Sequence, residues 1–309
     1  MKVMVTGGAG FIGSHIVDRL IELGHDVIIL DNLSTGKKAF IHPGASFYQV
    51  DLRDRRLGEI LEAERPEAVI HQAAQIDVPT SVKDPLFDAE TNILGTLQLL
   101  EACRRSGVRK IVYASSAAVY GEPVFLPIDE EHPVDPLSNY GISKYTPECY
   151  LKVYKQLYGL DYTILRYANV YGIRQDPRGE GGVIAIFLDR VLREEALTIF
   201  GDGKQTRDFV YVGDIAEANI RALHRGSGRV FNLGTGVPTS LEELVRILGE
   251  VTEKEIRVEY APERPGDIRH SHFDCRRAEK WLDWTPRIDL KTGLRMTYEY
   301  YLEAARRLP

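Results

Sequence analysis

Cysteine is scarce in this chain, with three in 309 residues, and Cys103, Cys149 and Cys275 are widely separated. They form no CxxC pair and no evident metal pattern, so we expect reduced thiols, no metal site and a cytoplasmic protein. No apolar run is as long as about 18 residues, the length that a membrane-spanning helix needs. The first residues also lack the charged, apolar and small-residue segments of a signal peptide. Basic residues are also in deficit: the net charge of −6 argues against non-specific binding to nucleic acid.

Short apolar runs alternate with amphipathic segments through the first half of the chain. Strands are predicted at Val3–Thr6, Asp26–Leu30, Ser46–Val50, Ala68–His71, Lys110–Ser115 and Tyr162–Arg166. Helices are predicted at Phe11–Leu23, Arg55–Glu64, Ala89–Ser106 and Asn139–Tyr158, where apolar residues recur every three or four positions. This alternation indicates an α/β fold, a Rossmann-like doubly wound parallel sheet covered on both faces.

The pattern changes after about residue 170, where helices are predicted at Val183–Glu194, Ile215–His224 and Leu241–Val251. We therefore expect residues 1–170 to form a dinucleotide-binding domain and residues 171–309 to form a smaller α/β lobe that binds substrate. The apolar run Val230–Leu233 reads as another strand. A segment near 208–235 is accordingly expected to return to the first domain.

A glycine-rich turn follows the first predicted strand and opens the first predicted helix. The sequence Gly8-Ala9-Gly10-Phe11-Ile12-Gly13 fits GxGxxG, and Gly7, Gly10 and Gly13 fit a wider spacing. Such glycines allow a tight turn, close approach of the backbone to a pyrophosphate and tight packing of helix on strand. The helix then begins with free N–H groups that face the phosphates. A glycine turn without a ligand is the alternative, which the strand-turn-helix context makes much weaker.

The ends of the next three strands supply further candidates for contacts with a dinucleotide. Asp31 ends the second strand, where a carboxylate accepts the ribose hydroxyls, and Asn32 rather than an arginine follows it. This favours NAD over NADP. Asp51-Leu52 would lie near the adenine, and the small pair Ala73-Ala74 would let the backbone approach the cofactor. Alone, these pairs could equally be ordinary strand-end turns.

Tyr140 and Lys144 are four residues apart on a predicted helix and therefore share a face. A free tyrosine, with a pKa near 10, is a weak base at neutral pH, but a nearby ammonium favours the phenolate. An isolated pair of this kind is usually a surface feature. Here Ser115 and Ser116 end the fifth predicted strand, and ligands of parallel sheets bind at that end of the strands. The sequence thus predicts a proton-transfer site beside a nicotinamide.

Four motifs together resemble the extended short-chain dehydrogenase/reductase family, and within it the NAD-dependent nucleotide-sugar epimerases. They are Thr6-Gly7-Gly8-Ala9-Gly10-Phe11-Ile12-Gly13, Ser115-Ser116-Ala117-Ala118-Val119-Tyr120-Gly121, Tyr140-Gly141-Ile142-Ser143-Lys144 and Arg166-Tyr167-Ala168-Asn169-Val170-Tyr171-Gly172. The resemblance implies that Tyr140 is the base, that Ser116 shares the hydrogen bond to the sugar 4′-hydroxyl, and that Lys144 holds the nicotinamide ribose.

The resemblance also implies the residues that bind a UDP-sugar substrate. It places Tyr167 near the nicotinamide, Asn169 against the diphosphate, Arg207 and Arg264 on the phosphates, and Asp267 on the uridine ribose. The fixed charge and planar fork of arginine suit phosphate oxygens. Phe200 is expected to line the base pocket, with core packing an equal alternative.

Two positions depart from the family, and two others discriminate within it. Pro147 lies within the predicted helix that carries Tyr140. It has no N–H to bond to the carbonyl of Ser143, so we expect it to kink this helix. Ile76 stands where well-known epimerases carry a lysine near the cofactor. In the family, 4,6-dehydratases place an Asp-Glu pair where this chain has Ala117-Ala118. The resemblance therefore implies interconversion of UDP-glucose and UDP-galactose at C4.

Several alternatives remain open from the sequence. Ser271 is small where a bulky residue restricts the sugar in the family, which implies use of UDP-GlcNAc and UDP-GalNAc as well. UDP-glucuronate epimerisation and a net nucleotide-sugar reductase are other candidates, and a non-catalytic NAD-binding regulator is a candidate from another class. As in the family, Ala89–Ser106 and Asn139–Tyr158 could pair with their copies in a homodimer.

Overall fold

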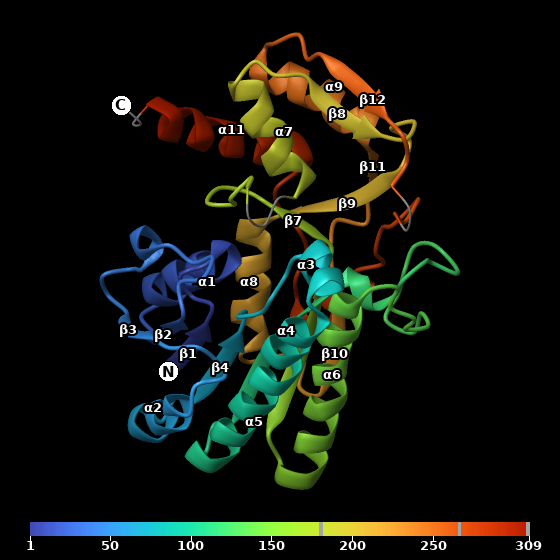
Figure 1. Ribbon diagram of the computed structural model, residues 1–309. Helices are drawn as coiled ribbons and strands as arrows, with labels where there is room; N and C mark the ends of the chain where they lie inside the picture. Colours follow the sequence, from blue (N-terminus) through green and yellow to red (C-terminus); the bar gives the residue numbers. More distant parts are fainter. Residues whose placement is uncertain (179–181, 265–266, 307–309) are drawn as a thin grey trace.

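A parallel sheet forms the centre of the molecule in the computed structural model, which describes residues 1–178, 182–264 and 267–306 (Figure 1). Its seven strands run in the order β3-β2-β1-β4-β5-β6-β10. The strand bounds are β1 Lys2–Thr6, β2 Asp26–Asp31, β3 Ser46–Gln49, β4 Ala68–His71, β5 Lys110–Ser116, β6 Asp161–Tyr167 and β10 Arg229–Leu233. The expected Rossmann-like α/β fold is confirmed.

Alternate side chains of each central strand enter two different apolar layers. In β1, Val3 and Val5 pack with helices α1 (Phe11–Glu22) and α8 (Val212–Ala222). Met4 packs on the other face, which is covered by the helices α2 (Arg56–Glu64), α5 (Gly95–Ser106) and α6 (Asn139–Tyr158). Because both faces are buried, the strands read as continuous apolar runs in the sequence. Helices α5 and α6 lie side by side in front of the sheet in Figure 1.

A smaller lobe lies beyond the carboxyl ends of the central strands, above the sheet in Figure 1. Its sheets have the strand orders β11-β9-β7 and β12-β8. The strands are β7 Asn169–Tyr171, β8 Leu197–Phe200, β9 Thr206–Tyr211, β11 Pro238–Ser240 and β12 Val258–Ala261. The helices are α7 Val183–Leu192, α9 Leu241–Thr252 and α11 Leu290–Arg306, whereas α10 (Arg276–Leu282) packs on β10 and α8 of the central part. The apolar faces of α7, α9 and α11 share one core with β8 and β9, which is separate from the two apolar layers of the central sheet.

The chain crosses between the two parts more than once. Strand β10 pairs with β6, with Phe231 opposite Leu165, so this segment is the seventh strand of the central sheet. Helix α8 precedes it and packs on α1. The division into a cofactor domain and a substrate lobe at residue 170 stays a prediction.

One predicted helix is divided in the structure. The expected Ala89–Ser106 consists of α4 (Pro85–Ala89), a π-helical turn at Glu90–Leu94 and then α5. The side chain of Asn92 in that turn is buried and bonded to neighbouring elements. Turns of this type frequently occur at functional sites, which periodicity alone does not reveal.

The other predicted strands and helices of the first half are confirmed to within about two residues. In the second half, the helix expected at Ile215 begins at Val212. The short strands of the lobe and helices α10 and α11 were not predicted. Among the residues that the structure describes, no helix is long and apolar enough to span a membrane.

Candidate active site

The glycine turn between β1 and α1 has a conformation that only glycine can adopt easily. Gly7 has φ +70°, and a Cβ there would come within 2.8 Å of the Ala73 nitrogen. A Cβ on Gly13 would collide with the carbonyl oxygen of Gly7. The cap position of α1 is Gly10, which has no side chain to accept the first N–H groups of the helix. These groups are therefore free to bind an anion such as a pyrophosphate.

Asp31 lies at the end of β2, beside the glycine turn. Its carboxylate accepts N–H groups from Ala9 at 3.0 Å and from Leu33 at 2.8 Å. Burial raises the pKa of Asp31, and these two hydrogen bonds oppose the rise. Each oxygen keeps a lone pair for a further donor, so the carboxylate both fixes the turn and can accept hydroxyl groups.

Asn32 and Asp51 are brought together at the ends of β2 and β3. The Asn32 side-chain amide donates to Asp51 over 2.8 Å. Arg53 also donates to Asp51 and holds the pKa of that carboxyl well below its usual range. The following residue, Leu52, is buried. The predicted adenosine-binding residues therefore form one connected group.

Ala73 and Ala74 follow β4 on the opposite side of the glycine turn. Ala73 N donates to the Thr6 hydroxyl over 3.3 Å, and its backbone lies against Gly7. The other two residues predicted to contact the cofactor are Phe11 and Ile12. Phe11 is buried in the core of the lobe, and Ile12 packs against both that core and the core of the central sheet. Small residues, free helix N–H groups and a carboxylate are the features that suit NAD.

Tyr140 and Lys144 begin helix α6, and Ser116 ends strand β5. Ser138 caps α6 by accepting the N–H of Gly141 at 3.0 Å, which fixes the first turn. Burial raises the pKa of the Tyr140 phenol, and a hydrogen bond with Ser116 acts against that rise. The structure thus brings the predicted serine and tyrosine together.

Lys144 is buried on the same helix face. Burial lowers the pKa of Lys144 to about 8, while the carboxylates of Asp88 and Glu148 act to raise it. Its Nζ lies 4.8 Å from the centroid of the Tyr113 ring. We expected a nearby ammonium to lower the pKa of Tyr140, but the pKa is raised: burial and the Asp88 carboxylate raise it, and the group that acts to lower it is Ser116, not Lys144.

A cluster of buried polar side chains beside helix α6 was not predicted from the sequence. Asn92 donates to the Ser143 hydroxyl over 2.9 Å and to Asp88 over 3.2 Å. Gln75 also donates to Asp88, over 2.7 Å, and its backbone N–H bonds to Asn92. The one available signal was the polarity of Asp88 and Asn92 at positions where an amphipathic helix would be apolar.

Helix α6 remains a single helix through Pro147. Side chains support the backbone on the preceding turn: the Tyr113 hydroxyl donates to the Lys144 carbonyl over 3.1 Å. The Ser143 hydroxyl donates to the Tyr140 carbonyl over 3.0 Å. The proline is therefore accommodated within the helix that carries Tyr140 and Lys144.

The side chain of Tyr167 is directed at two side-chain amides, those of Gln72 and the buried Asn219. It ends β6 opposite Ser116 in the sheet register. Its hydroxyl lies 3.0 Å from the Gln72 nitrogen and 2.8 Å from the Asn219 nitrogen. Its hydroxyl thus connects the segment after β4 to helix α8.

The predicted nucleotide-binding residues gather in the lobe. A hollow of about 160 Å³ is lined by Phe200, Gln205, Arg264 and Asp267, among others. The Arg264 guanidinium lies 3.7 Å from the centroid of the Phe200 ring. A partly buried aromatic ring next to fixed positive charge suits a base attached to phosphates.

Arg207 lies on β9, close to the same hollow. Burial lowers the pKa of Arg207 and the Asp267 carboxylate acts to raise it, so the two side chains interact. Asn169 begins the neighbouring strand β7, opposite Phe209 of β9. Four of the five predicted substrate residues in the lobe are therefore close in space, and Asn169 is exposed on the adjacent strand.

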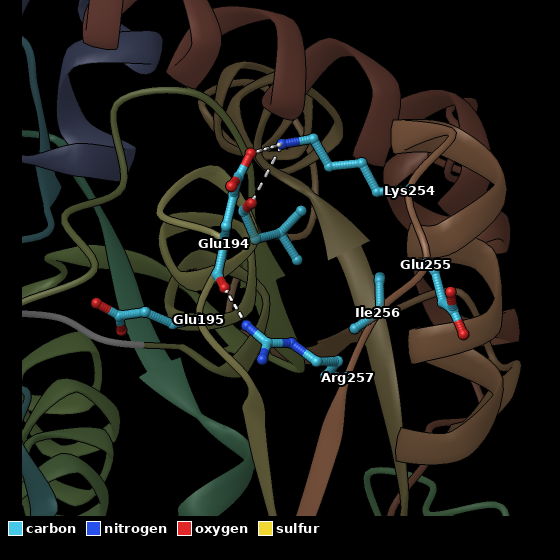
Figure 2. Close-up of a pocket in the computed structure, with 7 residues that line it drawn as sticks. Glu194, Glu195, Lys254, Glu255, Ile256 and Arg257 are labelled. Atoms are coloured by element: carbon cyan, nitrogen blue, oxygen red, sulfur yellow. Dashed lines mark hydrogen bonds and ion pairs between the residues drawn. The ribbon is translucent and has the colours of Figure 1, made fainter.

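A second hollow, of about 380 Å³, lies elsewhere in the lobe, between the end of α7 and the loop before β12. Figure 2 shows its charged lining: Arg257 donates to the Glu194 carbonyl over 2.7 Å, and Lys254 lies 3.9 Å from the Glu194 carboxylate. None of the predicted site residues lines it. Because its cations already face acceptors of the chain, we assign no role to this hollow.

Comparison with known proteins gives relatives over nearly the whole chain. A UDP-glucose 4-epimerase of Mycolicibacterium smegmatis is 44% identical over 308 residues, which span 97% of this chain and 98% of the relative. A crystal structure of a UDP-glucose 4-epimerase with UDP-glucose from Thermotoga maritima has a TM-score of 0.96 and 47% identity, and the match covers 99% of this chain and 100% of that one.

A UDP-glucose 4-epimerase of Thermus thermophilus, solved in complex with NAD, has a TM-score of 0.94 and 45% identity, with 98% of this chain and 100% of that chain covered. The model of the NAD dependent epimerase/dehydratase family matches residues 3–234. This range contains the glycine turn, Ser116 and the Tyr140–Lys144 pair. The chain therefore belongs to the NAD-dependent epimerase/dehydratase family, within the extended short-chain dehydrogenases/reductases.

Proposed function

We propose that this protein is a UDP-glucose 4-epimerase, which interconverts UDP-glucose and UDP-galactose through a transient 4-keto sugar. The observation that carries the proposal is the hydrogen bond between Ser116 and Tyr140 at the carboxyl end of β5, with the buried Lys144 one helical turn later on α6. The glycine turn that fits NAD lies at the same edge of the sheet, at the carboxyl end of β1. The identity to UDP-glucose 4-epimerases over nearly the full length supports it.

The residues of the glycine turn, with Asp31, Asn32, Asp51 and the Ala73-Ala74 backbone, would hold NAD. Bound NAD supplies a reversible acceptor for the hydride of C4. Tyr140, hydrogen-bonded to Ser116, takes the proton of the sugar 4′-hydroxyl and returns it in the second half of the reaction. Lys144 contributes a positive charge that favours the phenolate and binds the nicotinamide ribose.

The short turn after β5 argues against water elimination. Ala117 and Ala118 form a 3-10 turn directly after Ser116, and Ser116 Oγ accepts the N–H of Ala118 at 3.2 Å. Neither alanine can donate or accept a proton through its side chain. The simplest chemistry for such a site is oxidation and re-reduction at one carbon.

The hollow in the lobe would hold the nucleotide while the sugar turns. We assign Arg207 and Arg264 to the diphosphate, Asp267 to the uridine ribose, Phe200 to the base and Asn169 to the diphosphate. A nucleotide fixed at these points leaves the 4-keto sugar free to rotate about its link to the diphosphate. The other face of C4 is then presented for re-reduction.

The decisive experiment incubates the purified protein with UDP-galactose, without added NAD, and follows the formation of UDP-glucose. Conversion with no net change in absorbance at 340 nm supports an epimerase that retains NAD. A stoichiometric absorbance change would instead support a net reductase or dehydrogenase. Tyr140→Phe is expected to lose at least about 100-fold in kcat, in line with the loss of a general base, whereas Tyr150→Phe on the same helix serves as control.

Substrate breadth is a second part of the proposal. Ser271 N donates to the Thr206 carbonyl over 3.2 Å, which places this small residue beside the strand that carries Arg207. We propose that UDP-GlcNAc and UDP-GalNAc are also interconverted. Absence of turnover of UDP-GlcNAc, when UDP-glucose is converted, would exclude this; UDP-glucuronate is the remaining substrate to test.

We further propose a cytoplasmic homodimer. Apolar side chains remain exposed on the outer face of α6, namely Ile142, Val153 and Leu157, and all three cysteines are unpaired. Pairing of α5 and α6 with their copies would bury this face. Light scattering on the purified protein measures the mass: a monomer at micromolar concentration would contradict the dimer.

A further inference from the structure

A buried ion pair joins the catalytic helix to the two strands whose ends carry Ser116 and Tyr167. Arg166 on β6 donates to Glu148 on α6 through Nε at 2.9 Å and Nη2 at 2.6 Å. The hydroxyl of Ser115 on β5 donates to the same carboxylate over 2.6 Å. Glu148 is 0% and Arg166 3% exposed, so the pair is withdrawn from water.

The pair touches the site through its neighbours in the chain. Ser115 and Arg166 are opposite each other in the sheet, and the next residues along the same strands are Ser116 and Tyr167. Glu148 lies one helical turn after Lys144. Each member of the cluster is therefore one residue, or one helical turn, away from a residue of the proposed site.

Burial makes this cluster costly and therefore informative. Removing two charges from water costs several kcal/mol per ion before their attraction is counted, and a well-packed apolar pair is often as stable. A buried salt bridge is thus a weak explanation of stability. The presence of this ion pair is better explained by a need to fix the positions of the residues next to it, Ser116, Tyr167 and Lys144.

The proline gives a specific reason for such a requirement. Pro147 has no N–H, so the carbonyl of Ser143 loses its helical donor, and the missing bond lies in the turn that links Lys144 to Glu148. A helix weakened at this turn can bend there. An anchor at Glu148 holds the turn against the sheet on the far side of the weak point.

The other side of the cluster is also fixed. The Arg166 guanidinium lies 4.7 Å from the centroid of the Tyr120 ring. Tyr120 in turn donates its hydroxyl to Asn232 over 2.7 Å, on strand β10. The arginine is therefore held by stacking as well as by the carboxylate, and the anchor extends over three strands.

We propose that Glu148, Arg166 and Ser115 form a positioning group that holds the Tyr140–Lys144 turn of α6 in register with Ser116. The inference rests on the roles proposed above for Tyr140, Lys144 and Ser116. Glu148 acts through Lys144 and Tyr140 and does not itself contact the substrate. A second, electrostatic effect accompanies the first, because the Glu148 carboxylate favours the protonated form of Lys144.

The test replaces the ion pair by an apolar pair of similar size, Glu148→Met with Arg166→Met. If the group positions the site, the double variant folds, with a thermal midpoint close to that of the wild type. Its kcat for UDP-galactose is then expected to fall by about 10-fold or more, the loss typical of a misplaced catalytic group, while KM changes little. In the dependence of kcat on pH, the alkaline limb is expected to move to lower pH, since Lys144 loses a carboxylate that raises its pKa.

Ser115→Ala is the milder variant, since it removes one hydrogen bond and leaves both charges paired. We expect a smaller loss of kcat in the same direction. Thr297→Val is the matched control, because Thr297 is equally buried and donates to the Gly293 carbonyl over 2.6 Å on α11, far from the site in the chain. A folded double variant, or Ser115→Ala, with the kcat and pH profile of the wild type would overturn the proposal.

The wild-type protein is assayed first, so that failure of the proposed function is recognised separately. If it does not convert UDP-galactose, a ¹³C NMR titration of the lysine side chains still tests the group. The Lys144 signal is expected to titrate near pH 8 in the wild type and at lower pH in the double variant. Identical titration in both proteins would contradict the proposed coupling of Glu148 to Lys144.

Discussion

Replacing Lys144 by methionine is expected to make the cofactor-free protein more stable while it inactivates the enzyme. Burial lowers the pKa of Lys144 from 10.5 to about 8. At about 1.4 kcal/mol per pH unit, this difference corresponds to roughly 3 kcal/mol by which folding disfavours the charged form. The value already includes the attraction of Asp88 and Glu148, which act in the opposite direction. Methionine has a similar length and carries no charge, so it avoids this cost.

The gain in stability depends on pH in a defined way. Below about pH 8, Lys144 is protonated in both folded and unfolded wild-type protein, and the full cost is present. Between about pH 8 and 10.5, the unfolded chain still binds the proton and the folded protein does not. The free energy of unfolding of the wild type therefore rises with pH in this window. The advantage of Lys144→Met should narrow there and vanish above it.

Chemical unfolding of cofactor-free protein by urea, at pH 7 and at pH 10.5, measures both effects. The variant should exceed the wild type by roughly 3 kcal/mol at pH 7, or roughly 5 °C in thermal midpoint for a chain of this size. Lys152→Met, at an exposed position of the same helix, is the control and should show neither effect. A variant that is no more stable than the wild type at pH 7, or a difference independent of pH, would refute the reasoning.

Three further changes test other parts of the site. Gly13→Ala should abolish retention of NAD, measured by the absorbance ratio at 260 and 280 nm, because the added Cβ would collide with the Gly7 carbonyl; retained NAD would contradict the role of the turn. Asp88→Asn should lower the pKa of Lys144 below about 8 and shift the alkaline limb of kcat to lower pH, since a carboxylate that favours the ammonium is removed; an unshifted limb would count against it. Arg264→Ala should raise the KM or Kd for UDP by about 10-fold or more, as for loss of a charged hydrogen bond of about 1.5–3 kcal/mol, with little change in kcat; unchanged UDP affinity by calorimetry would remove this residue from the nucleotide site.

The central sheet was predictable because its signal is local. Each of its strands is buried on both faces, so Ala68–His71 or Lys110–Ser116 appears as an uninterrupted apolar run between helical segments. The short strands of the lobe lack this signal. Strand β11, for example, is Pro238-Thr239-Ser240, which forms because β9 offers a pairing edge and not because of its own composition.

The glycine turn and the position of Tyr140 and Lys144 on one helix were predictable from spacing, since each involves residues close together in the sequence. The polar residues around them were not. Asp88 and Asn92 are bonded to each other, but Gln75 is 13 residues from Asp88 and Ser143 is 51 from Asn92. Contacts of this kind are visible only once the fold has brought the ends of β4, α4 and α6 together.

The same distinction explains why Pro147 looked more disruptive in the sequence than it is in the structure. A proline inside a helix removes one backbone hydrogen bond, and the sequence shows only this loss. The compensating contacts come from elsewhere: the Tyr113 hydroxyl on β5 bonds to the Lys144 carbonyl, and Arg166 on β6 anchors Glu148. The helix that carries Tyr140 and Lys144, the two groups proposed to act in catalysis, is thus fixed by the strands themselves. Sequence changes in β5 and β6 should therefore affect turnover as directly as changes in α6.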